Sequence, residues 1–224
     1  MAVAYDNFVK VTFGGVATIT TGSFTITSSA NRAALMNMSF STNAATGISG
    51  SVAGVSGTAI TGTDSGAAEL MRSLQFGVIA PGSGSQTGTM SWTTNRTGTL
   101  GVVTASGVDQ TTAFNNGTFA QASPNTTLAV TITSTSGDLT ADNCATQLDT
   151  FTLPTQTEIY NDTATTDYGC SSRGPGSGNT THSWTSTGTQ TTVISGCNFV
   201  QSSGAAAVYP IDNTAAMLAI GLIG

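Results

Sequence analysis

Apolar and β-branched residues alternate with small polar residues along most of this 224-residue chain, in short runs. Successive side chains of a β-strand point to opposite faces, so a period of two is typical of strands with one buried face. Glycine-rich turns separate the runs at intervals of about 8–12 residues, a spacing typical of sandwiches and barrels. The pattern therefore predicts an all-β fold, an antiparallel β-sandwich of about a dozen strands.

The alternation defines the expected strands, which are 8–13, 16–26, 33–41, 51–56, 70–79, 88–93, 100–105, 127–133, 139–148, 183–195, 205–209 and 217–223. No linker or repeat divides the chain, so residues 1–224 are predicted to form a single domain. Residues 156–183 are the most loop-like part and contain a Gly-Pro-Gly turn. We therefore predict a long loop-rich insertion around 150–183 at one edge or end of the sandwich.

Charged residues make up only 7% of the chain, with five basic and eleven acidic side chains. The 43 Thr and 25 Ser residues make the chain polar in their place. Nucleic-acid binding and binding to anionic membranes both need clustered Lys and Arg, which this chain lacks. The first residues lack the features of a secretory signal, and the apolar stretch 215–224 is too short to span a bilayer. We expect neither a nucleic-acid nor a membrane partner.

The three cysteines are widely spaced and form no metal-binding motif. Two interpretations stay open for them. All three are buried free thiols, or one disulfide, Cys170–Cys197, forms in a protein that functions outside the cell.

Several phrases of the sequence match a known module in order along the chain: NRAAL at 31–35, TMSWT at 89–93, SGVDQTT at 106–112 and VTITSTSGDL at 130–139. Together they resemble a jelly-roll-like β-sandwich module found in bacterial surface proteins and in structural proteins of tailed bacteriophages. The resemblance implies a jelly-roll-like fold and an interaction role, and it carries no catalytic residues. It is weakest over 150–183, and Ala113 stands where the module has a proline.

The signature residues Asp109, Gln110, Thr111 and Thr112 have a structural interpretation and a functional one. An Asp side chain often accepts hydrogen bonds from backbone amides two residues on and closes a turn. A calcium site would instead need several oxygen ligands to converge, and no calcium-binding loop pattern is present. The structural role is the prediction.

Catalytic chemistry finds little support in the sequence. His182 is the only histidine, and no Gly-x-Ser-x-Gly motif accompanies it. No spacing of carboxylates singles out a pair for glycoside hydrolysis. We therefore predict no catalytic residue, cofactor or metal ligand, and a histidine that is either exposed or hydrogen-bonded within the fold.

A glycan site is the small-ligand alternative, because sugars bind to exposed aromatic faces beside amide and charged groups. Trp184, His182, Tyr168 and Arg173 lie close together in sequence and are the candidate residues. The competing interpretation places Trp92 and Trp184 in the core, as is common for large aromatic residues of sandwiches.

A virion protein of a bacteriophage would combine a hydroxyl-rich, nearly lysine-free surface with synthesis in a host cytoplasm. The prediction is a non-enzymatic capsid decoration or accessory protein on the virion surface. Its expected partners are further copies of itself, for example in a trimer, and the major capsid protein or other virion proteins. The alternative is an extracellular or cell-surface carbohydrate-binding module or adhesin, including a phage tail or fibre component that binds host glycans.

Overall fold

The computed structural model describes residues 1–40, 45–66, 71–122, 127–147, 150–152, 154–162, 167–186 and 190–203. These residues form seventeen strands and no helix, and the strands pair in antiparallel sheets that pack together. The prediction of an all-β sandwich is confirmed. The strands expected at 205–209 and 217–223 lie outside the described residues.

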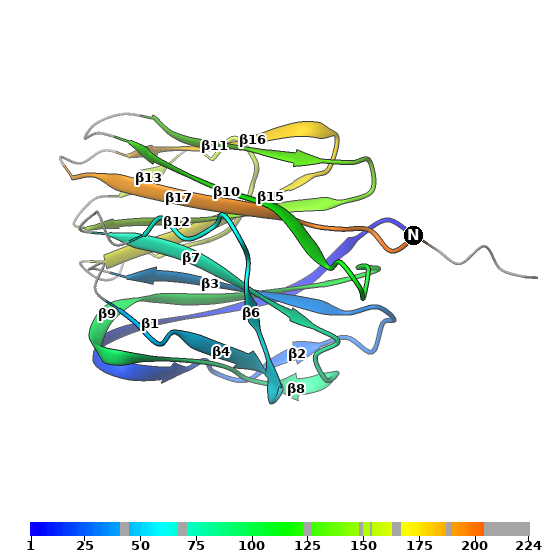
Figure 1. Ribbon diagram of the computed structural model, residues 1–224, viewed down its shortest axis with the longest axis horizontal. Helices are drawn as coiled ribbons and strands as arrows, with labels where there is room; N and C mark the ends of the chain where they lie inside the picture. Colours follow the sequence, from blue (N-terminus) through cyan, green and yellow to red (C-terminus); the bar gives the residue numbers. More distant parts are fainter. Residues whose placement is uncertain are drawn as a thin grey trace, which may run out of the picture.

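Three sheets stack in Figure 1, and we name them lower, middle and upper from their places in that view. The lower sheet contains β1 (Ala4–Thr20), β3 (Ala33–Phe40), β4 (Ser49–Val52), β5 (Val55–Ser56), β6 (Thr58–Ala59), β7 (Arg72–Ile79) and β9 (Gly88–Ser106). The middle sheet has the order β10 (Phe114–Ala122), β17 (Thr192–Phe199), β12 (Leu139–Gln147), β15 (Asp167–Pro175) and β14 (Thr157–Asn161). The upper sheet has the order β11 (Thr127–Ser134), β16 (Gly178–Ser186) and β13 (Phe151–Thr152). A separate pair joins β2 (Phe24–Ile26) to β8 (Gly84–Gln86).

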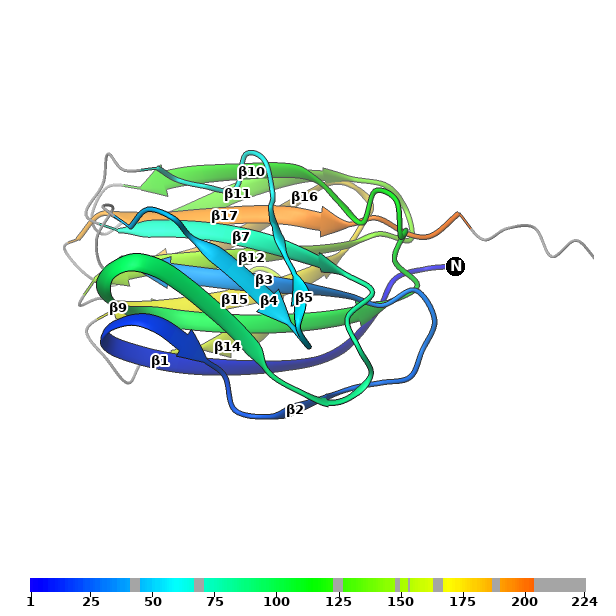
Figure 2. The same ribbon diagram turned by 60° about the horizontal axis from the view of Figure 1, so that its bottom comes forward.

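The lower sheet folds back on itself, because β1 and β9 are long strands that bend together (Figure 2). Their register shifts between Phe13 and Val16, so that the two halves of each strand serve two layers. Gly98 of β9 lies at this bend, where a Cβ atom would come within 1.9 Å of the Ser39 carbonyl oxygen. The bend explains why each of these strands was predicted as two.

The folded lower sheet encloses the first apolar core. Its largest members include Met36, Phe40 and Trp92. The Trp92 indole N–H donates to the Val16 carbonyl across the bend, over 3.0 Å. Trp92 is therefore a core residue, which confirms the structural interpretation.

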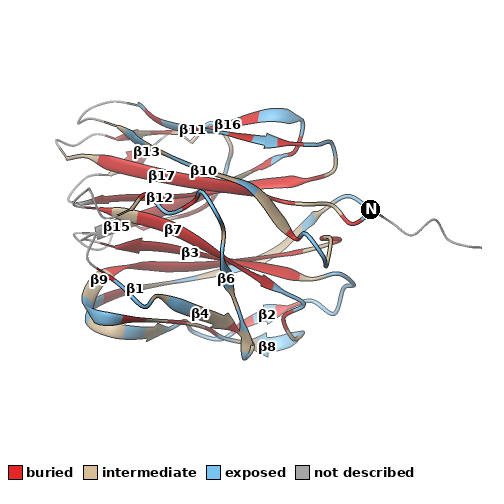
Figure 3. Cartoon of the chain, in the orientation of Figure 1, coloured by how far each residue is buried: buried red, intermediate tan, exposed pale blue. Residues whose placement is uncertain are grey.

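The middle sheet is covered on both faces, as the buried strands in the centre of Figure 3 show. Along β12, Leu139 and Ala141 pack toward the lower sheet, and Cys144 packs in the core below the upper sheet. The protein thus has three packed sheets where a simple sandwich has two, and seventeen described strands where about a dozen were expected.

The prediction of a loop-rich insertion around 150–183 is wrong. This region contains β13, β14, β15 and the first part of β16. Small polar residues such as Ser171 and Ser172 occupy consecutive buried positions of β15, because each faces a different neighbouring sheet. Their hydrogen bonds take the place of apolar contacts, and the expected alternation is lost.

Candidate functional site

Five polar or aromatic side chains meet between the middle and upper sheets, and all five are fully buried. Thr140 and Asp142 lie two residues apart on β12, on the face that the upper sheet covers. Strand β15 contributes Ser172. The facing strand β16 supplies His182 and Trp184, two residues apart and therefore on the same face. We call these five residues the Asp142 cluster.

The Asp142 carboxyl group is the centre of the cluster. Its Oδ2 atom accepts hydrogen bonds from the Trp184 indole N–H and from the Ser172 hydroxyl, each with a donor–acceptor distance of 2.8 Å. Its Oδ1 atom accepts a further bond from the Ser172 backbone amide. Three donors converge on one carboxyl group, which an ionised carboxylate accommodates because it only accepts.

The His182 ring joins the cluster through both nitrogens. Its Nδ1 atom lies 3.2 Å from Asp142 Oδ2 and 2.9 Å from the Ser172 hydroxyl oxygen. Its Nε2 atom lies 2.8 Å from the Thr140 hydroxyl oxygen, and that hydroxyl donates to the Gly174 carbonyl. Nε2 is therefore the donor toward Thr140, which fixes the proton on that nitrogen.

The cluster contains a serine, a histidine and an aspartate, but their order does not match a hydrolytic triad. In a triad the aspartate and the serine contact different ring nitrogens, so that the imidazole can accept the serine proton. Here Ser172 and Asp142 both approach Nδ1, and the three residues have no exposed surface. The arrangement supports a structural crosslink between two sheets.

The aromatic platform proposed for glycan binding is wrong. Trp184 and His182 are fully buried within the Asp142 cluster. The Arg173 guanidinium carbon lies 4.3 Å from the centre of the Tyr5 ring, which joins β15 to β1. Tyr168 lies on β15 opposite Thr146, and its side chain is outside the described residues. The carbohydrate-binding alternative therefore loses the surface on which it rested.

A second buried polar cluster, which the sequence reasoning missed, joins the middle sheet to the lower one. The Asn143 side-chain amide donates to the Met38 carbonyl over 2.9 Å and to the Ser73 hydroxyl over 2.8 Å. The Asn37 amide donates to the Ser171 hydroxyl over 3.1 Å and accepts from Gln75 over 2.9 Å. The signal in the sequence was the adjacent Asp142 and Asn143, because two consecutive polar residues in a strand place one on each face.

The signature turn has the predicted structural role. Asp109 Oδ1 accepts hydrogen bonds from the backbone amides of Thr111, over 2.8 Å, and Thr112, over 2.7 Å. The hydrogen bonds from these backbone amides lower the pKa of the Asp109 carboxyl, and the bond from Thr112 has the largest effect. Gln110 donates to the carbonyls of Val108 and Arg32, which ties the turn to the start of β3. Among the described residues no group of acidic, histidine or cysteine side chains could hold a metal ion.

The cysteines agree with the interpretation as three buried free thiols and not with the Cys170–Cys197 disulfide. All three are free and fully buried. Cys170 and Cys197 lie on β15 and β17, which flank β12 on opposite sides, so that pair is not bridged. Cys144 lies directly opposite Cys170 instead. Burial raises the pKa of Cys170 to about 12, and it also raises the pKa of Cys144 and Cys197.

An open groove of about 750 Å³ lies on the surface of the described residues. One wall is the segment 55–61, which includes β6, and the other is the segment 111–117, which begins in the signature turn and enters β10. The Phe114 ring packs over Gly77 of β7, where a Cβ atom would come within 2.3 Å of the ring. The backbones of Gly62 and Gly117 approach each other closely just beyond the segment 55–61, where a Cβ atom on Gly62 would come within 2.2 Å of the Gly117 carbonyl oxygen. We call this the β6–β10 groove.

Comparisons with protein-family models, curated proteins and solved structures find no match to the chain. Within the described residues, no helix is long and apolar enough to cross a membrane.

The Asp142 cluster predicts unequal effects of two tryptophan substitutions. Trp184→Phe removes a donor to a buried carboxylate and should lower the free energy of unfolding by about 2–3 kcal/mol. Trp92→Phe removes the same atoms but leaves only the neutral Val16 carbonyl without its donor. The lost hydrogen bond should therefore lower the free energy of unfolding by about 1 kcal/mol. Urea unfolding of both variants measures the difference. Equal losses, or a larger loss for Trp92→Phe, would contradict the central role of Asp142.

The Asp109 turn predicts a pH-dependent contribution to stability. Its folded pKa is lowered, so the stabilisation is present above the unfolded value of about 3.9 and is lost as pH falls through the folded value. Asp109→Asn keeps an acceptor oxygen but removes the charge. The difference in unfolding midpoint between wild type and Asp109→Asn should therefore be largest near pH 7 and shrink toward about pH 3. A difference that is constant with pH would show that the charge is not involved.

Thiol labelling tests the cysteine assignment. The native protein should react negligibly with a thiol reagent at about pH 8, since burial keeps the groups protonated and inaccessible. After unfolding without reductant, all three thiols should react. An exposed Thr112→Cys residue provides the control and should react in the native state. Fewer than three reactive thiols after unfolding would reveal a disulfide.

Proposed function

We propose that this protein is a non-enzymatic structural protein of a bacteriophage virion, a capsid decoration protein that docks on the assembled particle. The buried polar clusters support a scaffold that holds sheets together, and the outer sheet faces support a docking role. Host cytoplasm is the proposed place of synthesis, and the virion surface is the proposed final location.

The observation that carries the proposal is the outer face of the upper sheet. Strands β11 and β16 pair there in the order Thr127 with Thr185, Ala129 with Ser183, Thr131 with Thr181, and Thr133 with Asn179. None of these eight side chains is charged, and the β11 members are exposed. The inward residues of the same strands, among them Leu128 and Trp184, are buried. The result is an uncharged surface supported by a packed core.

Hydrogen bonds between the strands order this surface. The hydroxyls of Thr131 and Thr181 lie 3.0 Å apart, and Thr133 donates to the Asn179 side chain over 3.2 Å. A partner that covers such a face removes hydroxyls and methyl groups from water but no charge, so the desolvation penalty is small. Side chains already held in place also lose little conformational entropy on binding.

A similar arrangement lies on the opposite outer face, in the folded-back part of the lower sheet. Thr20 and Thr89 approach within 2.9 Å, and Thr18 donates to Ser91 over 3.1 Å. A molecule with two such faces is suited to lie between neighbours, either the capsid lattice and solvent or the lattice and a second copy. Docking then stabilises the assembled particle by mass action, because the lattice is bound better than its separate parts.

The test begins with mass spectrometry of density-purified particles, where tens to hundreds of copies per particle are expected. Rebinding to particles that lack the protein then locates the docking face. Thr131→Glu combined with Thr181→Glu should lower occupancy about tenfold or more, because two charges are introduced into the contact. Thr20→Glu combined with Thr89→Glu is the matched control on the opposite face and should bind normally.

Absence of the chain from particles, together with its presence in the medium or cell envelope, would overturn the proposed function. Loss of binding by the control pair alone would keep the virion assignment and overturn the choice of the upper sheet as the docking face.

A further inference from the structure

The β6–β10 groove is an apolar hollow with a polar rim. Ile60, Ile79 and Phe114 provide its largest apolar side chains, and Thr111, Thr112 and Asn115 are among the polar ones. Ile79 is 38% exposed, which makes it one of the few large apolar side chains on the surface of the described residues. No lining residue is charged. An occupant that matches this groove is therefore an apolar, uncharged stretch of chain.

Residues 204–224 of this chain have that chemistry. They lie outside the described residues, contain Val208, Ile211, Leu218 and Ile220 among many alanines, and carry a single charge at Asp212. At about 3.3 Å per residue, an extended stretch of this length spans roughly 70 Å. An apolar stretch of this kind is costly to leave in water.

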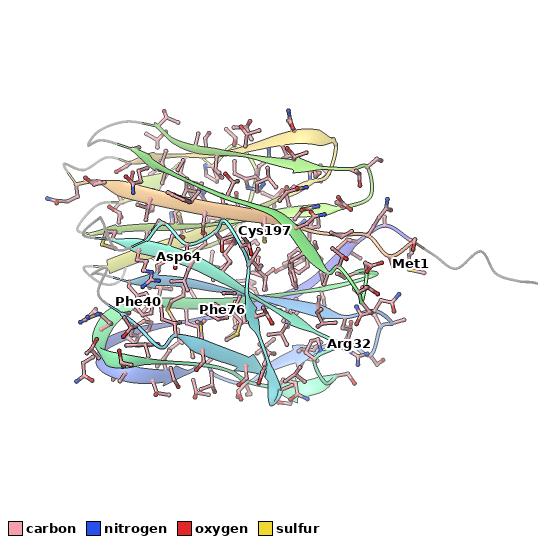
Figure 4. All side chains as sticks on the ribbon, in the orientation of Figure 1. Met1, Arg32, Phe40, Asp64, Phe76 and Cys197 are labelled. Carbon is pink, nitrogen blue, oxygen red and sulfur yellow. The ribbon has the colours of Figure 1, made fainter. Side chains whose placement is uncertain are left out.

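The last described residues show where this segment leaves the fold. The Val200 amide donates to the Ala113 carbonyl, and the Ser202 amide donates to the Gly107 carbonyl over 2.8 Å. The chain thus passes the wall of the groove and continues away from it, toward the end of the molecule where Met1 lies (Figure 4). A return to its own groove would require the segment to reverse the direction that residues 200–203 take, which favours the groove of a neighbouring copy.

We propose that the apolar segment 205–223 of one copy binds in the β6–β10 groove of a second copy. Apolar side chains of the segment fill the space beside Ile60, Ile79 and Phe114, and the rim amides and hydroxyls bond to its backbone. Because donor and acceptor surfaces differ, the contact is heterologous and closes into a ring or continues as a chain of copies. The inference concerns how copies join, and it goes beyond docking on a capsid.

Disulfide trapping between full-length variants tests the proposal directly. Chains with Thr112→Cys, in the groove wall, are mixed with chains carrying Leu218→Cys and are oxidised mildly with oxidised glutathione. A disulfide-linked dimer that contains one chain of each kind is expected. Thr181→Cys, exposed on the outer face of the upper sheet, replaces Thr112→Cys in the control and should give at least about tenfold less of this dimer.

A second pair of variants tests the chemistry of the groove. Ile79→Glu in the Thr112→Cys chain should reduce the dimer about tenfold or more, because it places a charge in the apolar contact. Phe119→Glu is the matched control, since Phe119 is also an exposed apolar residue, 44% exposed, and does not line the groove. Thermal unfolding of both variants verifies that they are folded.

Three outcomes would overturn the proposal. A Thr112→Cys, Leu218→Cys double variant that forms only an internal disulfide would place the segment in its own groove. The absence of any Thr112–Leu218 disulfide would leave the groove to another occupant. Equal dimer yields with Ile79→Glu and Phe119→Glu would show that the groove is not the contact. None of these results depends on particle binding, so failure here is distinguishable from failure of the proposed function.

Discussion

The structure depends on one strand, β12, whose two faces are both covered by other sheets. Asp142 and Asn143 are adjacent on it and point in opposite directions, each into an interface without solvent. A buried polar group without a partner costs about 1–3 kcal/mol, so each sheet that covers β12 must present matching donors and acceptors at one position. The upper sheet does so with Trp184, and the lower sheet does so with Ser73 and the Met38 carbonyl.

This requirement fixes how the three sheets sit on one another. An apolar interface tolerates a slip of one residue pair at modest cost, because similar side chains come into contact again. A slip of β16 over β12 would instead separate the indole N–H from Asp142 and the His182 ring from Thr140. Each buried donor or acceptor that such a slip leaves without its partner costs about 1–3 kcal/mol. The two clusters therefore select one arrangement among several that the apolar cores alone would allow.

The sequence predicted the fold class and several elements because their patterns are local. Alternation located β3, β7 and β11, and the SGVDQTT turn was correct down to the hydrogen bonds of Asp109. The largest error arose where small polar residues occupy both faces of a buried strand. In β15, polar residues face both neighbours and resemble a loop. The predicted strand 183–195 also began too late to show that His182 and Trp184 share a face with the buried Thr180. Partners in other sheets, which local pattern does not reveal, decide these positions.

The scarcity of charge has a consequence for how the stability of this fold depends on salt. The ion pairs between charged side chains of the described residues join Lys10 to the buried Asp162 and Arg72 to the half-exposed Asp64. Salt screens exposed charges much more than buried ones, so the free energy of unfolding should change little with ionic strength. Hydroxyl faces outside and hydrogen-bonded clusters inside are likewise insensitive to salt. The packing of the described residues therefore depends mainly on apolar contacts and hydrogen bonds, and only to a small extent on exposed charge.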